Sequence, residues 1–194
     1  MGSFNDDSIL LVVDMQNDFV REGGALYVPS FDEERKKIGL DEHFLKNINH
    51  IINEFPLENI YTTEDLHLKD SIEFNKFPVH CLNGTWGQEY ISELNHIYLN
   101  TKKIIKGINS NIFSFSIMSS DNLTFIDNWR REGIKNIYLV GVAYDFCVGE
   151  SAIDLAKQGF NVYIFRNLTK SVSEMTSKLM DEKLKLYNVN KLIA

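Results

Sequence analysis

Short apolar runs alternate with longer amphipathic stretches along most of the chain. The apolar runs have the length and β-branched content that are typical of strands, and several are almost continuously apolar, as expected when helices cover both faces of a sheet. The pattern therefore predicts an α/β fold of three αβα layers around a central, mostly parallel six-stranded sheet. The strand-like runs are 8–14, 58–63, 102–106, 136–141, 160–166 and 190–193, and the helix-like stretches are 41–55, 88–97, 121–133, 147–159 and 173–187.

Two stretches do not follow this alternation. Residues 19–38, which contain Gly23, Gly24 and Pro29, and residues 64–87, which contain Pro78 and Gly84, show neither helical nor strand periodicity. Loops of this length in a compact domain are commonly functional. No repeat or linker divides the chain, so residues 1–194 are expected to form a single domain.

Composition and charge exclude several classes of function. The 194 residues carry a formal net charge of -7, and the lysines are dispersed among carboxylates, which excludes a nucleic-acid partner. No apolar run reaches the ~20 residues that span a bilayer, and the first residues lack the features of a signal peptide, so we expect a cytoplasmic protein without a membrane partner. The two cysteines, Cys81 and Cys147, are expected to be free thiols in a reducing compartment.

Three residues with catalytic chemistry stand where strand-like runs end. Cys147 lies where the run 136–141 gives way to a helix-like stretch, and there free amides and the helix dipole would favour a thiolate. Asp14 and Lys106 close two other runs. Because parallel strands end at one edge of a sheet, where open α/β folds bind their ligands, the spacing suggests one cleft with an acid, a cation and a thiol.

A second set of candidates lies in the loop 64–87. Asp65 and His67 flank Leu66 on an extended segment, which projects both side chains to one face, and Glu73 and His80 follow. These residue types ligate metals. Each candidate also has a structural alternative: histidines on loops are often solvated, and Cys147 can be a packing residue. Asp14 can cap a turn, and Lys106 can be an ordinary strand-end lysine.

Five sequence blocks containing these candidates occur in one order that identifies a family. Over residues 8 to about 170, the chain resembles the nicotinamidases of the isochorismatase-like cysteine hydrolase superfamily. The blocks are Leu11-Val12-Val13-Asp14-Met15-Gln16-Asn17-Asp18-Phe19, Asp65-Leu66-His67, Phe77-Pro78-Val79-His80-Cys81 with Asn83-Gly84-Thr85, Lys106-Gly107, and Gly141-Val142-Ala143-Tyr144-Asp145-Phe146-Cys147-Val148.

The resemblance implies a single isochorismatase-like hydrolase domain that converts nicotinamide to nicotinate and ammonia through a cysteine thioester. Pyrazinamide is an expected analogue substrate. The implied catalytic triad is Asp14, Lys106 and Cys147, and the amides of Ala143 and Cys147 would form the oxyanion hole. A cis peptide is expected before Ala143. Homo-oligomers are common in this superfamily, so the resemblance also allows self-association.

The resemblance also implies a metal site and an aromatic substrate pocket. Asp65, His67 and His80 would bind a divalent metal such as zinc, and Glu73 would be a further ligand at a place where family members differ. Phe19 and Phe77 would flank the substrate ring; as apolar residues they could equally be core.

Two departures from the family pattern and two other functions bear on this hypothesis. Leu66 and Leu68 replace the aromatic residue and the proline of the common Asp-Trp-His-Pro, and Phe77 stands where many relatives have Trp, which affects substrate affinity more than reaction type. An isochorismatase-like or N-carbamoyl amide hydrolase is the first alternative, but such enzymes generally lack this metal set. A non-catalytic scaffold with a structural metal is the second, but it would not need the three catalytic candidates together.

Overall fold

A computed structural model describes residues 4–31, 37–38, 42–121 and 123–194. Its centre is a six-stranded sheet in the order β5-β4-β1-β6-β7-β8, in which every neighbouring pair is parallel. The predicted α/β fold with a parallel six-stranded sheet is therefore confirmed. The strands are β1 (Ser8–Val13), β4 (Ile60–Asp65), β5 (Lys102–Lys106), β6 (Asn136–Val142), β7 (Asn161–Lys170) and β8 (Asn190–Leu192).

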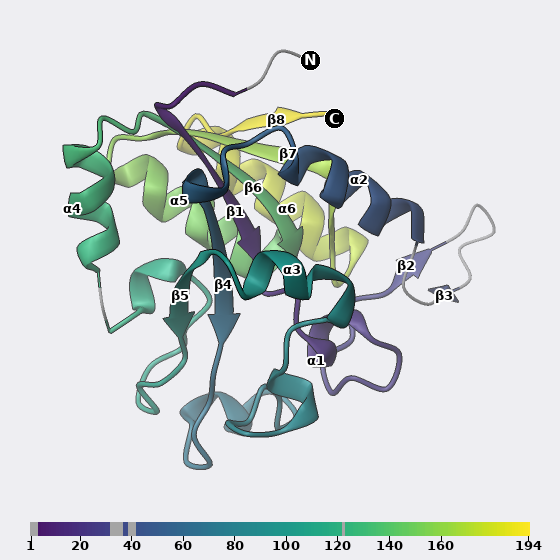
Figure 1. Cartoon of the computed structure of the whole chain (residues 1–194). Helices are drawn as coiled ribbons and strands as arrows, with labels where there is room; N and C mark the ends of the chain where they lie inside the picture. Colours follow the sequence, from purple (N-terminus) through teal and green to yellow (C-terminus); the bar gives the residue numbers. More distant parts are fainter. Residues whose placement is uncertain (1–3, 32–36, 39–41, 122) are drawn as a thin grey trace.

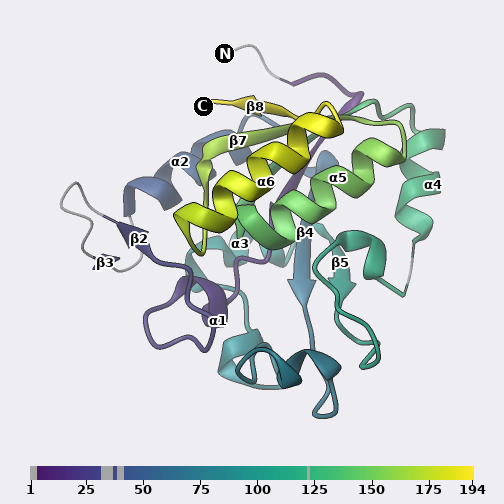
Figure 2. The same cartoon turned by 180° about the vertical axis from the view of Figure 1, so that it is seen from behind.

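Helices cover both faces of the sheet, as Figures 1 and 2 show from opposite sides. The longer helices on one face are α4 (Thr124–Arg131), α5 (Gly149–Lys157) and α6 (Glu174–Leu186), and the other face carries α2 (Glu42–Ile52) and the single turn α3 (Asn95–Tyr98). The loop after β1 contains α1 (Asn17–Val20) and β2 (Ser30–Phe31), which pairs with β3 (Lys37–Ile38). Among the described helices, none has both the length and the apolar character needed to cross a membrane.

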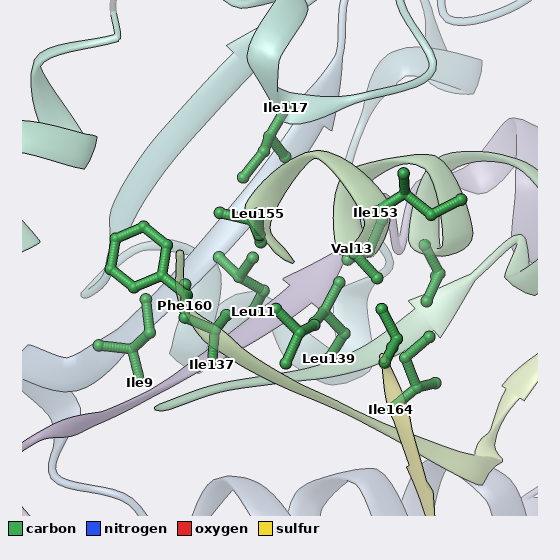
Figure 3. Close-up of a cluster of buried hydrophobic side chains, with 14 of the residues drawn as sticks. Ile9, Leu11, Val13, Ile117, Ile137, Leu139, Ile153, Leu155, Phe160 and Ile164 are labelled. Carbon is green, nitrogen blue, oxygen red and sulfur yellow. The ribbon is translucent and has the colours of Figure 1, made fainter. Parts of the chain in front are cut away.

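Strand β1 lies in the middle of the sheet and explains why its sequence is apolar throughout. Its side chains alternate between the two faces. Ile9, Leu11 and Val13 pack with α4, α5 and α6, whereas Leu10 and Val12 pack with α2 and α3. All five are at most 1% exposed. Figure 3 shows the first of these clusters, where Leu11 and Leu139 from adjacent strands lie under Leu155 of α5.

Gly141 sets the spacing between β1 and β6 near the carboxyl ends of both strands. Its φ is 107°, a conformation that favours glycine, and a Cβ at this position would lie 2.2 Å from the carbonyl oxygen of Val13. The two strands therefore approach more closely here than any side chain would permit. Asp14 and Ala143, which follow the two strands, therefore lie at the same edge of the sheet.

One predicted helix is largely wrong. Residues 88–97 do not form a continuous helix but two 3₁₀ turns, Trp86–Gln88 and Ser92–Leu94, followed by α3. Between the turns the backbone pairs with the segment after β1: the Ile91 amide donates to the Met15 carbonyl, and the Glu89 carbonyl accepts from the Asn17 amide, both at 2.9 Å. These long-range bonds replace the local helical ones. The other predicted helices are present but shorter, and residues 41 and 122 of the predicted helical stretches lie outside the described residues.

Candidate active site

Three strand ends bring an acid, a cation and a thiol together. Asp14 follows β1, Lys106 is the last residue of β5, and Cys147 lies in a π-helical turn, Tyr144–Val148, between β6 and α5. The Lys106 Nζ is 3.0 Å from Asp14 Oδ2. All three side chains are buried, and the Asp14 carboxylate is close enough to add to the effect of burial in raising the pKa of the Cys147 thiol. The sequence argument that parallel strand ends share one edge therefore applies to these three residues.

Thr63 holds the Asp14 carboxylate in place. Asp14 has a φ of 46°, a left-handed conformation that is costly for a residue other than glycine and that the surroundings must support. The Thr63 Oγ1 accepts from the Asp14 amide at 3.0 Å and donates to Asp14 Oδ1 at 2.6 Å. Sequence reasoning missed Thr63. The available signal was a hydroxyl in β4, two residues before Asp65 and therefore on the same face of the strand.

Lys106 connects Asp14 to Asp65, one of the metal-ligand candidates. Its Nζ lies 3.0 Å from Asp14 Oδ2 and 3.1 Å from Asp65 Oδ1. Burial by itself lowers the pKa of Lys106, but the two carboxylates outweigh burial and hold that pKa well above its ordinary value. Burial raises the pKa of Asp14, which the charge of Lys106 only partly offsets. For Asp65, Lys106 and the two histidines outweigh burial and lower the pKa to about 2.

The surroundings of Cys147 differ from the expectation based on the helix dipole. Burial raises the pKa of Cys147 well above its ordinary value, although the charge of Lys106 acts in the opposite direction. The resting thiol is therefore protonated, and it needs a base to become a nucleophile. The peptide between Val142 and Ala143 is cis, as the resemblance implies. The Ala143 carbonyl accepts from the Phe146 and Val148 amides at 3.1 and 3.0 Å, which shapes the turn around Cys147.

Four donor atoms, one from the last residue of β4 and three from the loop that follows, converge beside this group. Ligand atoms of Asp65, His67 and His80 all lie within 4.8 Å of one another, an arrangement that could hold a metal ion. The Asp65 Oδ2 is 3.1 Å from His67 Nε2 and 3.7 Å from His80 Nε2. The Glu73 Oε2 joins them, at 3.8 Å from His67 Nε2 and 3.9 Å from His80 Nε2. All four side chains are almost completely buried.

The histidines of this cluster are held by their second ring nitrogens. The His80 Nδ1 lies 2.8 Å from the Pro78 carbonyl, to which it donates, and the His67 Nδ1 lies 3.3 Å from the Ser71 hydroxyl. This leaves Nε2 of each ring directed at the two carboxylates. Metal-binding histidines are usually oriented in this way. Two imidazoles and two carboxylates in a buried cluster suit a borderline divalent cation, so the donor set fits the metal that the resemblance implies.

A cavity of about 310 Å³ opens onto both groups. Its size lies at the lower end of the range for small-molecule sites, about 300–1,000 Å³. Cys147, Asp65, Glu73 and His80 all contribute to its wall. The structure also brings both predicted aromatic residues to this cavity. Its apolar lining is Phe19, Ala25, Leu26, Tyr27, Val28, Phe77, Phe115, Val142, Ala143, Phe146 and Val172.

Sequence reasoning missed part of the aromatic wall. Phe115 and Phe146 lie edge-on to Phe77, with ring centroids 6.0 and 6.4 Å from its centroid, and the rings of Phe115 and Phe146 are 5.5 Å apart. Phe146 stands next to Cys147 in the recognised block, and that adjacency was a usable signal. Phe115 follows no strand run and belongs to no block, so nothing in the sequence marks it.

Gln16 joins the segment after β1 to the start of the metal-ligand loop. Its amide oxygen accepts from the Asp65 backbone amide at 2.8 Å, and its Nε2 donates to the carbonyls of Asp65 and Gln88, both at 2.7 Å. Gln16 is completely buried. Gln16 belongs to the first of the five sequence blocks, and in the structure it fixes the backbone at Asp65.

Comparison with known proteins agrees with the geometry. The isochorismatase domain family matches residues 8–190. The nicotinamidase of Acinetobacter baylyi is 31% identical over 84% of this chain and 81% of its own, and that of Saccharomyces cerevisiae is 28% identical over 93% and 97%. Among solved structures, the pyrazinamidase of Pyrococcus horikoshii in complex with zinc has a TM-score of 0.78 at 27% identity, covering 97% of this chain and 99% of its own. PnC1 of L. infantum in complex with nicotinate has a TM-score of 0.84 at 26% identity, covering 100% and 96%.

Proposed function

We propose that this chain, which belongs to the isochorismatase domain family, is a metal-dependent amidohydrolase that converts nicotinamide to nicotinate and ammonia. One observation carries the proposal. Lys106 joins Asp14 to Asp65 of the four-donor cluster, and Cys147 lines the same cavity as Asp65, Glu73 and His80. The named relatives act as support, because several are nicotinamidases that align over most of both chains.

Each of the three catalytic residues has one role: Cys147 is the nucleophile, Asp14 carries the proton, and Lys106 supplies a compensating positive charge. Asp14 takes the proton from the neighbouring Cys147 thiol, and the thiolate attacks the carboxamide carbon. Lys106 balances the buried negative charge during this transfer. The amides of Ala143 and Cys147 receive the oxyanion of the tetrahedral intermediate. Asp14 then gives its proton to the departing nitrogen, which leaves as ammonia, and a thioester remains on Cys147.

Asp14 serves a second time when the thioester is hydrolysed. As a general base it removes a proton from water, the hydroxide adds to the thioester carbon, and collapse of the intermediate releases nicotinate. The proton returns to the Cys147 sulfur, which restores the starting state. The raised pKa of Asp14 suits a group that must both accept and donate a proton in one cycle.

Asp65, His67, His80 and Glu73 would hold the divalent cation, for which we propose zinc. When bound, such an ion supplies a Lewis acid that orients the ring nitrogen of the substrate. Phe19 and Phe77 would flank the ring: both line the cavity, and the Phe19 ring is 5.9 Å from that of His80. The metal-ligand set favours this function over an isochorismatase-like or N-carbamoyl amide hydrolase.

The test is ammonia release from nicotinamide by wild type and by Cys147→Ala, each with and without a chelator. We expect turnover in untreated wild type alone, and its return when zinc is added back. A wild-type protein that stays inactive when metal is supplied would overturn the proposal, and carbamoyl amides and isochorismate would be the next substrates to test. Ammonia release from pyrazinamide is expected as well, because its ring also offers a nitrogen.

Three expectations from the sequence stay predictions. They are a single hydrolase domain over residues 1–194, a cytoplasmic location, and self-association into a homo-oligomer. The family match over residues 8–190 supports the first.

A further inference from the structure

A hydroxyl outside the recognised blocks contacts Glu73, one of the two carboxylates of the donor cluster. Ser114 lies in the segment between β5 and α4, forty-one residues away from Glu73, and both are 2% exposed. The backbone amide of Ser114 and its Oγ each donate to Glu73 Oε1, and both distances are 2.7 Å. Two hydrogen bonds from one residue thus occupy one oxygen of the carboxylate.

The occupied oxygen decides which part of Glu73 faces the cluster. Because Oε1 is held by Ser114, Oε2 is the oxygen near the histidines, 3.8 and 3.9 Å from their Nε2 atoms. Asp65 shows the same division: Lys106 holds its Oδ1 at 3.1 Å, and Oδ2 faces the histidines. Each carboxylate therefore presents one oxygen, so the two acids and the two histidines offer four ligand atoms.

The segment that carries Ser114 is fixed to the Glu73 segment at several points. The Ile72 amide donates to the Ser110 carbonyl at 2.8 Å, and Lys76 lies over the ring of Phe113, with Nζ 4.8 Å from its centroid. Glu73 lies between Ile72 and Lys76, and Ser114 directly follows Phe113. A hydroxyl held on a fixed segment can set the orientation of a ligand, as the outer partners of metal ligands do.

We propose that Ser114 is a positioning residue for the metal site, which holds Glu73 so that only Oε2 is presented to the cation and the site is four-coordinate from protein atoms. The inference rests on the proposed metal-dependent function but concerns a residue to which that function assigns no role. Without the hydroxyl, Glu73 keeps only the amide bond and is free to turn both oxygens toward the cation, which weakens zinc binding and changes the coordination geometry.

The test measures metal binding directly, apart from turnover. Wild type, Ser114→Ala, Ser114→Thr and the control Ser110→Ala would be stripped of metal, and their zinc dissociation constants determined by competition with a chromophoric chelator. Ser110 belongs to the same segment, but its hydroxyl contacts the exposed Asp70. We expect Ser114→Ala to bind zinc about 10-fold more weakly, near the lower end of the roughly 10–100-fold range for outer partners, because the amide bond survives. Ser114→Thr and Ser110→Ala should match wild type.

Two further measurements separate positioning from a general loss of structure. The visible absorption bands of the cobalt-substituted proteins report coordination geometry, and we expect them to change in Ser114→Ala and not in Ser110→Ala. In a Glu73→Gln background, Ser114→Ala should add no further loss of zinc affinity, because the carboxylate that it orients is gone. Ser114→Ala with the zinc affinity and cobalt spectrum of Ser110→Ala would overturn the inference.

The outcomes also distinguish this inference from the proposed function. If the wild type binds zinc and this binding depends on Ser114, but nicotinamide is not hydrolysed, the proposed substrate is wrong and the inference about Ser114 stands. If the wild type hydrolyses nicotinamide but binds no divalent metal, the inference and the proposed metal dependence are both wrong, and the proposed amidohydrolase activity stands.

Discussion

The two halves of the candidate site are built in different ways. The thiol half, Asp14, Lys106 and Cys147, stands at or just beyond the ends of β1, β5 and β6, so the sheet itself sets its geometry. The metal half lies mainly on the loop after β4, where only Asp65 belongs to a strand. Its positions depend on hydrogen bonds to distant segments, such as those from Ser114 to Glu73 and from Gln16 to Asp65. A sheet supplies precision through the backbone, whereas a loop needs polar side chains to supply it.

The largest expected effect separates the two halves by activity and metal content. Cys147→Ala should lower kcat on the order of 10⁴-fold or more, as loss of a nucleophile does, and should keep the zinc content of wild type. His80→Ala should lose bound zinc while iodoacetamide still alkylates Cys147 at the wild-type rate. Elemental analysis and mass spectrometry of the alkylated peptide check both results. Loss of metal from Cys147→Ala would contradict the separation.

Lys106 is where the two halves join, so its replacement should damage both. Lys106→Met leaves Asp14 and Asp65 buried without their common cation, and breaking a buried ion pair costs about 3–5 kcal/mol of unfolding free energy. Urea unfolding of the metal-free proteins measures this loss. Lys103→Met is the matched control, because Lys103 is an exposed residue of the same strand. Equal losses in the two variants would show that the buried pairs do not stabilise the fold.

A smaller effect is expected within the thiol half. Thr63→Val keeps the shape of the side chain but removes both hydrogen bonds to Asp14, which should cost about 1–3 kcal/mol of unfolding free energy. Thr62→Val is the control on the opposite face of β4: its hydroxyl contacts that of Thr101 at 3.3 Å, and the expected loss is about 1 kcal/mol or less. Urea unfolding again provides the measurement, and the order of the two losses is the result that matters.

The smallest predicted effect is a shift in the pH dependence of turnover. Asp14 must be ionised to take the thiol proton, and burial raises its pKa above 3.8, so kcat/KM should fall as the pH drops through that raised value. The Thr63 hydrogen bond favours the ionised form and lowers the pKa of Asp14. Thr63→Val should therefore move the acid limb to higher pH, and Thr62→Val should leave it in place. An acid limb that moves equally in both variants would contradict this assignment.

The same contrast explains what the sequence could predict. The sheet and the thiol half follow from local patterns, because apolar runs mark strands and parallel strands end at one edge. The metal-ligand candidates were selected by residue type. Thr63 left only a weak signal, its spacing from Asp65, and Ser114 left none, because each acts through a contact with a residue distant in sequence. The helix prediction for residues 88–97 is wrong for a related reason. Their hydrogen bonds to residues 15–17 are long-range contacts, which the periodicity of a local segment cannot indicate.

Gly141 has a consequence for anyone who would redesign this protein. Since a methyl group at this position would collide with the Val13 carbonyl, libraries that randomise the residues around Cys147, Gly141 included, would contain many chains in which β1 and β6 cannot pair here. Diversity is better placed at Leu26, Tyr27 and Val172, which line the cavity without belonging to the strand ends. The close approach of β1 and β6 thus restricts substitution at the strand ends, whereas the lining residues outside them can be varied.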